Sequence, residues 1–229
     1  MSNHHGATVA PDARPLSVVE LISAVHAKFS ENFDISKSQL PNADRSEHLA
    51  RTLSNARGTL EAQSEGHEHR SLLTTYVDEI FGDSISSLYL ASCGLYVAGK
   101  MLLRRSLELG LVIFAYWDSP AAFWAWRDHD ADIRFTTLSE YLSSAGYLSF
   151  LKTIPDQDQT LTLDIVPIEI LYRELSDVVH PKPRNFATQS AKRYVSDRES
   201  FEAYLKVHER TYQALNELLE ARFPAVKAR

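Results

Sequence analysis

Apolar residues recur every three or four positions along most of this chain, which is the spacing of amphipathic helices. The alternation of apolar and polar residues that indicates strands is almost absent. Residues 16–33 and residues 43–65 form the first two expected helices, the second with a narrow apolar stripe typical of a surface helix. The apolar positions of these two helices are Val19, Ile22, Val25 and Phe29, and then Leu49, Leu53, Ala56 and Leu60. The fold class is therefore predicted to be all-α.

A third helix is expected over residues 70–81, and the strongest apolar pattern follows it, from Ser84 to Trp117. Apolar residues occur on several sides of this stretch, which predicts one long, buried central helix of roughly 50 Å, since a helix rises about 1.5 Å per residue. Asp83 is the expected N-cap. Three glycines are points where the helix could kink or admit a neighbour closely: Gly94, Gly99 and Gly110.

Shorter helices are expected after the helix stop at Asp118-Ser119-Pro120, over residues 121–127, 138–142 and 147–151. A late helix should run from the N-cap Asp164 to His180, and its apolar face comprises Ile168, Leu171, Leu175, Val178 and Val179. Asp197 should cap a last amphipathic helix. Residues 1–15 lack apolar residues in number and are expected to be a disordered leader. Residues 16–83 are expected to pack as N-terminal helices on a helical bundle of residues 84–229, together forming one compact domain.

Charge and cysteine content narrow the range of functions. The 229 residues carry a net charge of −6, which argues against a protein that coats nucleic acid non-specifically but allows a local basic cleft. The single cysteine, Cys93, excludes an intrachain disulfide framework and a cysteine-rich zinc site, so a cytoplasmic location is expected. The uncharged stretch 109–117 is too short to span a bilayer, and no membrane partner is expected. The pairs His4–His5 and His67–His69 have no third ligand at suitable spacing, and His129 with Asp128 and Asp130 is interpreted as a polar turn rather than a metal site. Neither a metal nor a cofactor is therefore predicted.

The candidate chemistry lies on the late helix, where Arg173 and His180 are seven residues apart. Seven residues make about two helical turns, so both side chains leave the same face, with Asp177 between them. A guanidinium can hold phosphate oxygens, and an imidazole can act as general acid and base on a ribose hydroxyl. The alternative is structural: an ion pair of Arg173 with Asp177, and a histidine held near the helix C-terminus.

Two further groups of charges have the same two interpretations. Residues 181–195 contain cations and no acid, and this basic segment suits an anionic polymer or is simply a solvated loop. Its cations are Lys182, Arg184, Lys192 and Arg193. On the central helix, Arg105 and Glu108 are expected to form an i,i+3 ion pair, unless Glu108 reaches Arg173 instead, because a buried charge needs a partner.

These residues resemble a known family. A central Leu-Arg-Arg-Ser-Leu-Glu segment and a later Leu-Tyr-Arg-Glu-Leu-Ser-Asp-Val-Val-His-Pro segment are similar to the HEPN-like proteins, whose name stands for higher eukaryotes and prokaryotes nucleotide-binding domain. Their signature is an arginine followed, after four to six residues, by a histidine. The similarity covers about residues 84–220. Glu174 departs from the asparagine, aspartate or histidine that often follows the arginine in the nucleases.

The resemblance implies a helical bundle that forms a homodimer and cleaves RNA without a metal. Arg173 and His180 would be catalytic with Asp177 as the orienting residue, while Lys182 and Arg184 would hold flanking phosphates. Many such proteins are bacterial toxins or antiviral effectors that an antitoxin or defence partner restrains. Two other functions fit the same residues: a non-catalytic helical module that docks onto a partner protein, and a sensor that binds a nucleotide without cleaving it.

Overall fold

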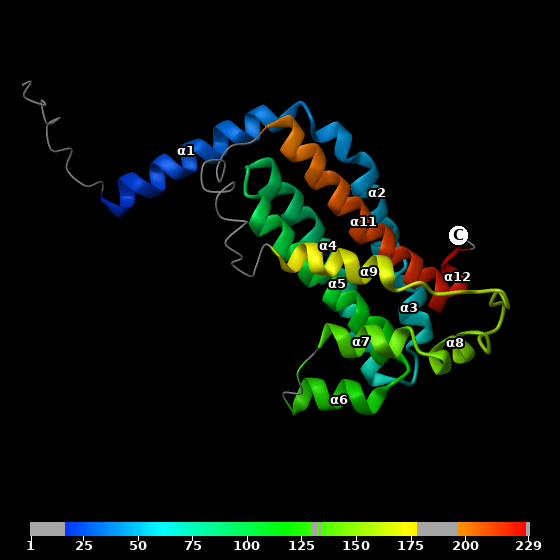
Figure 1. Ribbon diagram of the computed structural model, residues 1–229. Coiled ribbons are helices and arrows are strands. Elements are labelled where there is room, and N and C mark those ends of the chain that lie inside the picture. The colour runs from blue at the N-terminus through cyan, green and yellow to red at the C-terminus, as the bar shows by residue number, and fades with distance from the viewer. Residues whose placement is uncertain (1–16, 130–131, 133, 178–196, 228–229) are drawn as a thin grey trace, which may run out of the picture.

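The computed structural model describes residues 17–129, 132, 134–177 and 197–227, and in these ranges the chain forms helices and no strand (Figure 1). The all-α prediction is confirmed. The elements are α1 (Val18–Lys37), the 3-10 helix η1 (Leu40–Ala43), α2 (Asp44–Asn55), α3 (Arg57–Gln63), α4 (Glu68–Ser92), α5 (Tyr96–Trp117), α6 (Pro120–Asp128), α7 (Phe135–Leu142), α8 (Ala145–Leu151), α9 (Val166–Ser176), α11 (Arg198–Arg222) and α12 (Pro224–Lys227).

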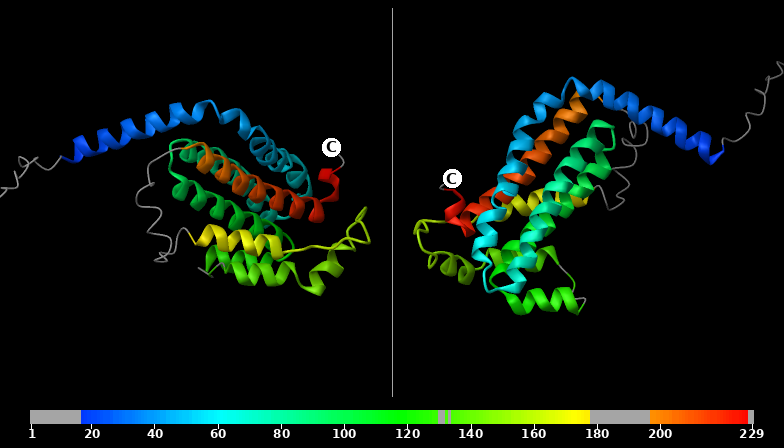
Figure 2. Two further views of the ribbon diagram at one scale, coloured as in Figure 1. Left: turned by 45° about the horizontal axis from the view of Figure 1, so that its top comes forward. Right: turned by 180° about the vertical axis from the view of Figure 1, so that it is seen from behind.

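Three long helices form the core. Helices α4 and α5 lie antiparallel as a hairpin and α11 packs against both of them, while α2 covers α11 and α4 from outside (Figure 2). Helices α7 and α9 pack on α5. The largest fully buried side chains come mainly from α5 and α11, and they include Phe114, Trp117, Phe201, Tyr204, Tyr212 and Phe223. Their burial supplies the main stabilisation, about 1.5–3 kcal/mol for each large apolar side chain.

The α4–α5 reversal depends on Gly94. This residue has a φ of 81°, a conformation that residues with a side chain rarely adopt. Its N–H bonds the Ala91 carbonyl at 2.9 Å, and the Leu95 N–H bonds the Leu90 carbonyl at 2.8 Å. These two hydrogen bonds are a Schellman motif, which satisfies the free carbonyls at a helix end.

The prediction of one central helix over residues 84–117 is therefore wrong in its connectivity. The chain reverses at residues 93–95, and the apolar residues on several sides belong to two antiparallel helices that bury each other. Asp83 is not an N-cap either. It lies inside α4, only 7% exposed, and both of its carboxylate oxygens accept hydrogen bonds from Arg105 Nη1, at 2.7 and 2.9 Å.

Other expected features are confirmed. The Asp197 carboxylate caps α11 by accepting the Ser200 N–H at 2.8 Å, and the predicted apolar face of α11 is buried. The prediction of one helix over residues 43–65 is wrong in its continuity, because the chain forms two consecutive helices, α2 and α3, although the expected apolar stripe does pack inward. The expected leader, residues 1–15, lies outside the described residues. No described helix combines the length and the apolar character needed to cross a bilayer.

A polar cluster is enclosed where α4, α5 and α11 meet. The Tyr212 hydroxyl donates to the Ile80 carbonyl at 3.0 Å and lies 3.1 Å from Ser106 Oγ. His208 is fully buried, and its Nε2 lies 3.0 Å from Ser84 Oγ. Burial lowers the pKa of His208 to about 4, because an imidazolium there would lose its hydration.

Gly110 lets α5 approach α11 closely, because a Cβ there would collide with the Leu215 side chain. We expect Gly110→Ala to lower the free energy of unfolding by about 1–3 kcal/mol, as overpacking does. Gly82→Ala is the matched control, since that helical position is exposed with nothing near its Cβ, and it should raise stability by about 0.5–1 kcal/mol. Urea unfolding of both variants checks this, and equal effects would contradict the packing.

The low pKa of His208 should make stability depend on pH. The unfolded histidine takes up a proton below its usual pKa of about 6.5, whereas the folded one stays neutral down to about 4. Stability is therefore lost as the pH falls through this window, by about 3 kcal/mol in total. The variant His208→Gln has no titrating group at this position and lacks this contribution. The difference in free energy of unfolding between the variant and the wild-type protein should therefore change by about 2–3 kcal/mol between pH 7 and pH 4.5. A pH-independent difference would show that His208 titrates normally.

Candidate functional site

Helix α9 is held on α5 through Tyr172. The Tyr172 hydroxyl accepts a hydrogen bond from Arg104 Nη2 at 2.8 Å and donates one to Glu108 Oε1 at 3.1 Å. Its ring stacks on Phe135 of α7 with centroids 3.7 Å apart, and the Arg104 guanidinium lies 4.9 Å from the ring centroid. Burial, followed by the Glu108 charge, raises the pKa of Tyr172, so the phenol keeps the proton that it donates.

Two acidic residues fasten α9 to other helices. Ser139 Oγ of α7 donates to Glu169 Oε1 at 2.5 Å, and Arg210 Nη1 of α11 donates to Glu174 Oε2 at 2.8 Å. The apolar face of α9 is buried against the bundle, as the sequence predicted, through Ile168, Leu171 and Leu175. The helix is thus fixed in rotation by contacts to three neighbouring helices.

This fixed rotation turns Arg173 outward. Its side chain is exposed, and Nε makes a hydrogen bond of 3.3 Å to the Glu169 carbonyl one turn earlier. Among the described arginines, Arg173 and the exposed Arg134 just before α7 have no ion pair, and the others each lie within 3.8 Å of a carboxylate oxygen. These paired arginines are Arg45, Arg51, Arg57, Arg70, Arg104, Arg105, Arg127, Arg198, Arg210 and Arg222.

The structural alternative for Arg173 is not realised in the described part of the chain, because Arg173 and Asp177 form no ion pair there. The Asp177 N–H donates to the Arg173 carbonyl at 3.0 Å, and Asp177 ends α9 as its C-cap. His180 and the cations of the basic segment lie outside the described residues. Those cations are Lys182, Arg184, Lys192 and Arg193.

The expected Arg105–Glu108 ion pair is wrong, and so is the alternative of Glu108 with Arg173. Arg105 pairs with Asp83 and Glu79 of α4, both at 2.7 Å, because the antiparallel hairpin places these carboxylates opposite it. Burial raises the pKa of Asp83, and the Arg105 charge opposes that rise. Glu108 pairs with Arg104 at 3.0 Å, since residues four apart lie on one helix face.

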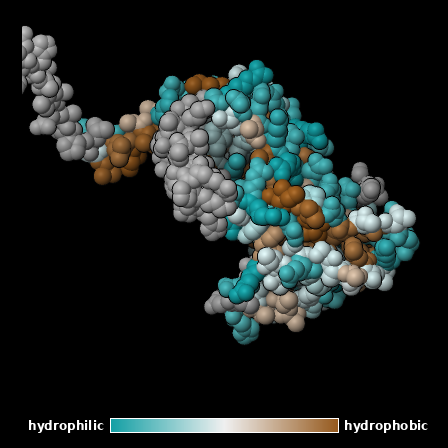
Figure 3. All heavy atoms as spheres, in the orientation of Figure 1, coloured by the Kyte–Doolittle hydropathy of each residue, from teal (hydrophilic) through white to brown (hydrophobic). Residues whose placement is uncertain are grey.

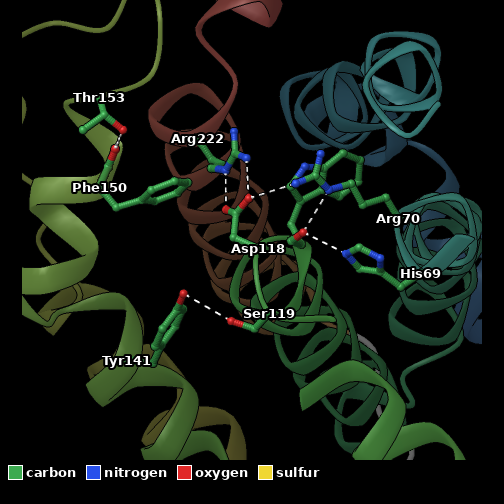
Figure 4. A network of polar contacts seen from close by, with 9 residues as sticks. His69, Arg70, Asp118, Ser119, Tyr141, Phe150, Thr153 and Arg222 are labelled. Atoms are coloured by element: carbon green, nitrogen blue, oxygen red, sulfur yellow. Dashed lines mark hydrogen bonds and ion pairs between the residues drawn. The ribbon is translucent and has the colours of Figure 1, made fainter. Parts of the chain in front are cut away.

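A second polar cluster surrounds Asp118 at the end of α5 (Figure 4). Both carboxylate oxygens of Asp118 accept hydrogen bonds from Arg222 of α11 at 2.7 Å, and Arg70 of α4 lies 3.4 Å away. The Trp117 carbonyl is 3.1 Å from His69 Nε2 and accepts a bond of 3.0 Å from Arg70 Nε. The sequence marked Asp118 only as a helix stop, because its partners are distant in sequence. With its oxygens occupied, the cluster is a structural joint between three helices.

A cleft of about 1440 Å³ opens at the other end of α9 from Arg173, between the loop of residues 154–164 and the end of α11. Its lining combines apolar residues with the acids Asp156, Asp158, Glu217 and Glu220. These carboxylates would repel the phosphates of a nucleic acid, so the cleft is not a candidate RNA site. Nowhere in the described ranges do three His, Cys, Asp or Glu side chains gather to hold a metal ion.

Comparison of the chain with protein-family models, with curated proteins and with solved structures finds no match. The resemblance to HEPN-like proteins therefore rests on the sequence segments alone.

The Asp118 cluster predicts a large cost for the loss of one charge. In Asp118→Asn two partly buried guanidiniums would face each other without a carboxylate, and breaking such a pair costs about 3–5 kcal/mol. Asp128→Asn is the matched control, because its ion pair with Arg127 is 3.5 Å long and solvent-exposed, and it should cost less than about 1 kcal/mol. Thermal and urea unfolding measure both, and a small loss for Asp118→Asn would show that the cluster does not join the helices.

Proposed function

We propose that this protein is a metal-independent endoribonuclease with Arg173 and His180 as its catalytic pair. The observation that carries the proposal is the exposed Arg173 guanidinium, which has no acidic partner in the described residues. Nε bonds the Glu169 carbonyl, and the terminal Nη donors of this cation are left for a phosphate. A guanidinium binds phosphate oxygens in a fork and is suited to the charge that develops in phosphoryl transfer.

The other residues have the following proposed roles. His180 takes the proton of a ribose 2′-hydroxyl and later protonates the leaving 5′-oxygen, which gives a cyclic phosphate end. Asp177 orients the pair. Lys182 and Arg184 hold flanking phosphates, and Lys192 and Arg193 extend the basic segment along the strand.

The carboxylate of Glu174, next to Arg173 in sequence, would by itself repel a phosphate bound at Arg173. Glu174 is bound by Arg210 at 2.8 Å, and this neighbouring cation offsets the repulsion between its carboxylate and a phosphate at Arg173. The site further includes a second copy of the chain, which would add a second Arg173 and His180 to one cleft. A cytoplasmic role in defence, or as a toxin held by an antitoxin, completes the proposal.

The second candidate function is docking onto a partner protein. Val166 and Ile170 are 54% and 51% exposed, and their spacing places them on the same stripe of α9 as Arg173. Exposed apolar side chains beside an arginine are typical of the core of a protein–protein interface. In this function the protein binds a partner through α9 and cleaves no RNA.

The double variant Arg173→Ala/His180→Ala separates the two functions. We expect the wild-type protein to cleave single-stranded RNA in the presence of EDTA, and the double variant to lose at least about 100-fold in rate, as removal of a general acid/base does. The Arg173→Ala part of the change should shift the free energy of unfolding by less than about 0.5 kcal/mol, because the side chain is exposed.

Arg198→Ala is the matched control, since Arg198 is an exposed helical arginine paired with Glu202 at 2.7 Å. It should keep the wild-type cleavage rate. If the wild-type protein leaves RNA intact under these conditions, or if the double variant cleaves at the same rate, the nuclease proposal is wrong. The docking function is then tested with the variant Ile170→Glu, which changes the exposed apolar stripe of α9 instead of Arg173 and His180.

A further inference from the structure

Helix α1 extends beyond the bundle to which it is attached (Figure 1). Its C-terminal part packs on the end of α4, and we call this contact the seat of α1. Asn32 is buried there and its side chain donates to the Cys93 carbonyl at 3.0 Å, while the ring centroids of Phe33 and Tyr89 are 6.0 Å apart. Its N-terminal part carries aliphatic side chains that are open to solvent. These are Val18, Val19, Leu21 and Ile22, which are 71%, 74%, 53% and 62% exposed.

The exposed residues continue the face that seats the helix. Val18, Ile22, Val25 and Asn32 follow the spacing of four, three and seven residues that keeps side chains on one helix face. The same stripe is thus buried on α4 near Asn32 and uncovered near Ile22, where Figure 3 shows brown apolar surface on the projecting helix. We call the N-terminal part, residues 18–25, the arm.

The sequence specifies the arm as helix although the bundle does not support it. Ser17 and Glu20 form a capping box, in which the Ser17 N–H bonds Glu20 Oε2 at 2.8 Å and the Glu20 N–H bonds Ser17 Oγ at 3.3 Å. No glycine or proline occurs in Val18–Lys37. Isolated helical segments this short are marginal in water, and their stability comes from packing of the apolar face. The arm therefore requires a covering surface.

We propose that the arm is covered by the arm of a second copy of this chain, in an antiparallel pairing about a two-fold axis. With the axis between Ile22 and Val25, each Ile22 packs against Val25 of the partner subunit. Each subunit then contributes the same apolar stripe to the interface, as a contact about a two-fold axis requires. The pairing uses only side chains that are exposed or half-buried in the single chain.

The seat of α1 favours a second copy over an unrelated partner. Beside the seat, α4 exposes a second apolar pair one turn apart, Ile85 at 44% and Tyr89 at 60%. Because the arms run antiparallel, the first turn of each arm points back toward the partner's α4, where this pair lies next to the contact of Phe33 with Tyr89. The straight, continuous α1 cannot fold its arm back onto its own α4. A second copy thus covers both exposed patches by one symmetric contact.

The test is the mass of the full chain in solution, measured by light scattering across a dilution series. We expect twice the 25.9 kDa of one chain for the wild-type protein, and a return to 25.9 kDa for Leu21→Glu/Ile22→Glu. Ala27→Glu is the matched control, because Ala27 is exposed on the opposite face of α1, and it should keep the doubled mass. A wild-type protein of single mass at every dilution, or an Ala27→Glu variant that also halves in mass, would overturn the proposal.

A cross-link keeps the test decisive if the double glutamate variant does not fold. Ile22→Cys should form a covalent dimer on oxidation, whereas Ala27→Cys should stay a single chain, and the native Cys93 is buried. Equal cross-linking of the two would contradict the arm pairing. Neither readout depends on RNA cleavage. A monomeric protein that cleaves RNA rejects the arm pairing and the two-copy cleft but leaves Arg173 and His180 as the catalytic pair, and an inactive dimer rejects the nuclease alone.

Discussion

The reversal of the chain at Gly94 is the constraint on which the rest of the structure depends. By turning back at this residue, the chain makes α4 and α5 antiparallel, and the two helices bury each other while α11 closes the core. The hairpin sets the partners of α5 on both sides. Arg105 meets Asp83 on the α4 side, and Arg104 is left to bind Tyr172 of α9 on the other. The left-handed backbone conformation of Gly94 thereby determines where the candidate site lies.

The orientation of α9 follows from that frame and is the physical reason for the exposure of Arg173. Tyr172, Glu169 and Glu174 each bind a different neighbouring helix. Together these contacts fix the rotation of α9 about its own axis. Arg173 lies between two of the fastened residues and points to solvent. Arg173 therefore adds no ion pair to the fold, unlike most arginines of the described helices, which are paired with a carboxylate.

The sequence predicted much of this fold, and its errors have one cause. The spacing of apolar residues correctly predicted the all-α class, the cap of α11 at Asp197 and the buried face of α9, because these are local properties. It failed where the outcome depends on contacts between distant segments. One buried helix and a buried hairpin of two helices give the same apolar pattern. Gly94 was therefore expected to kink the helix, whereas the chain reverses its direction there. The partners of Arg105 and of Asp118 could not be predicted, since ion pairing across helices leaves no mark in local spacing.

The most direct test of the account is a crystal structure of the full chain with a single-stranded oligoribonucleotide whose 2′-hydroxyl at the cleavage site is removed, so that it binds without being cut. We expect a phosphate within about 3 Å of the Arg173 guanidinium, with the His180 imidazole facing the modified ribose. Arg173 bound to a carboxylate and His180 enclosed among aliphatic side chains, with the oligonucleotide elsewhere or absent, would contradict it.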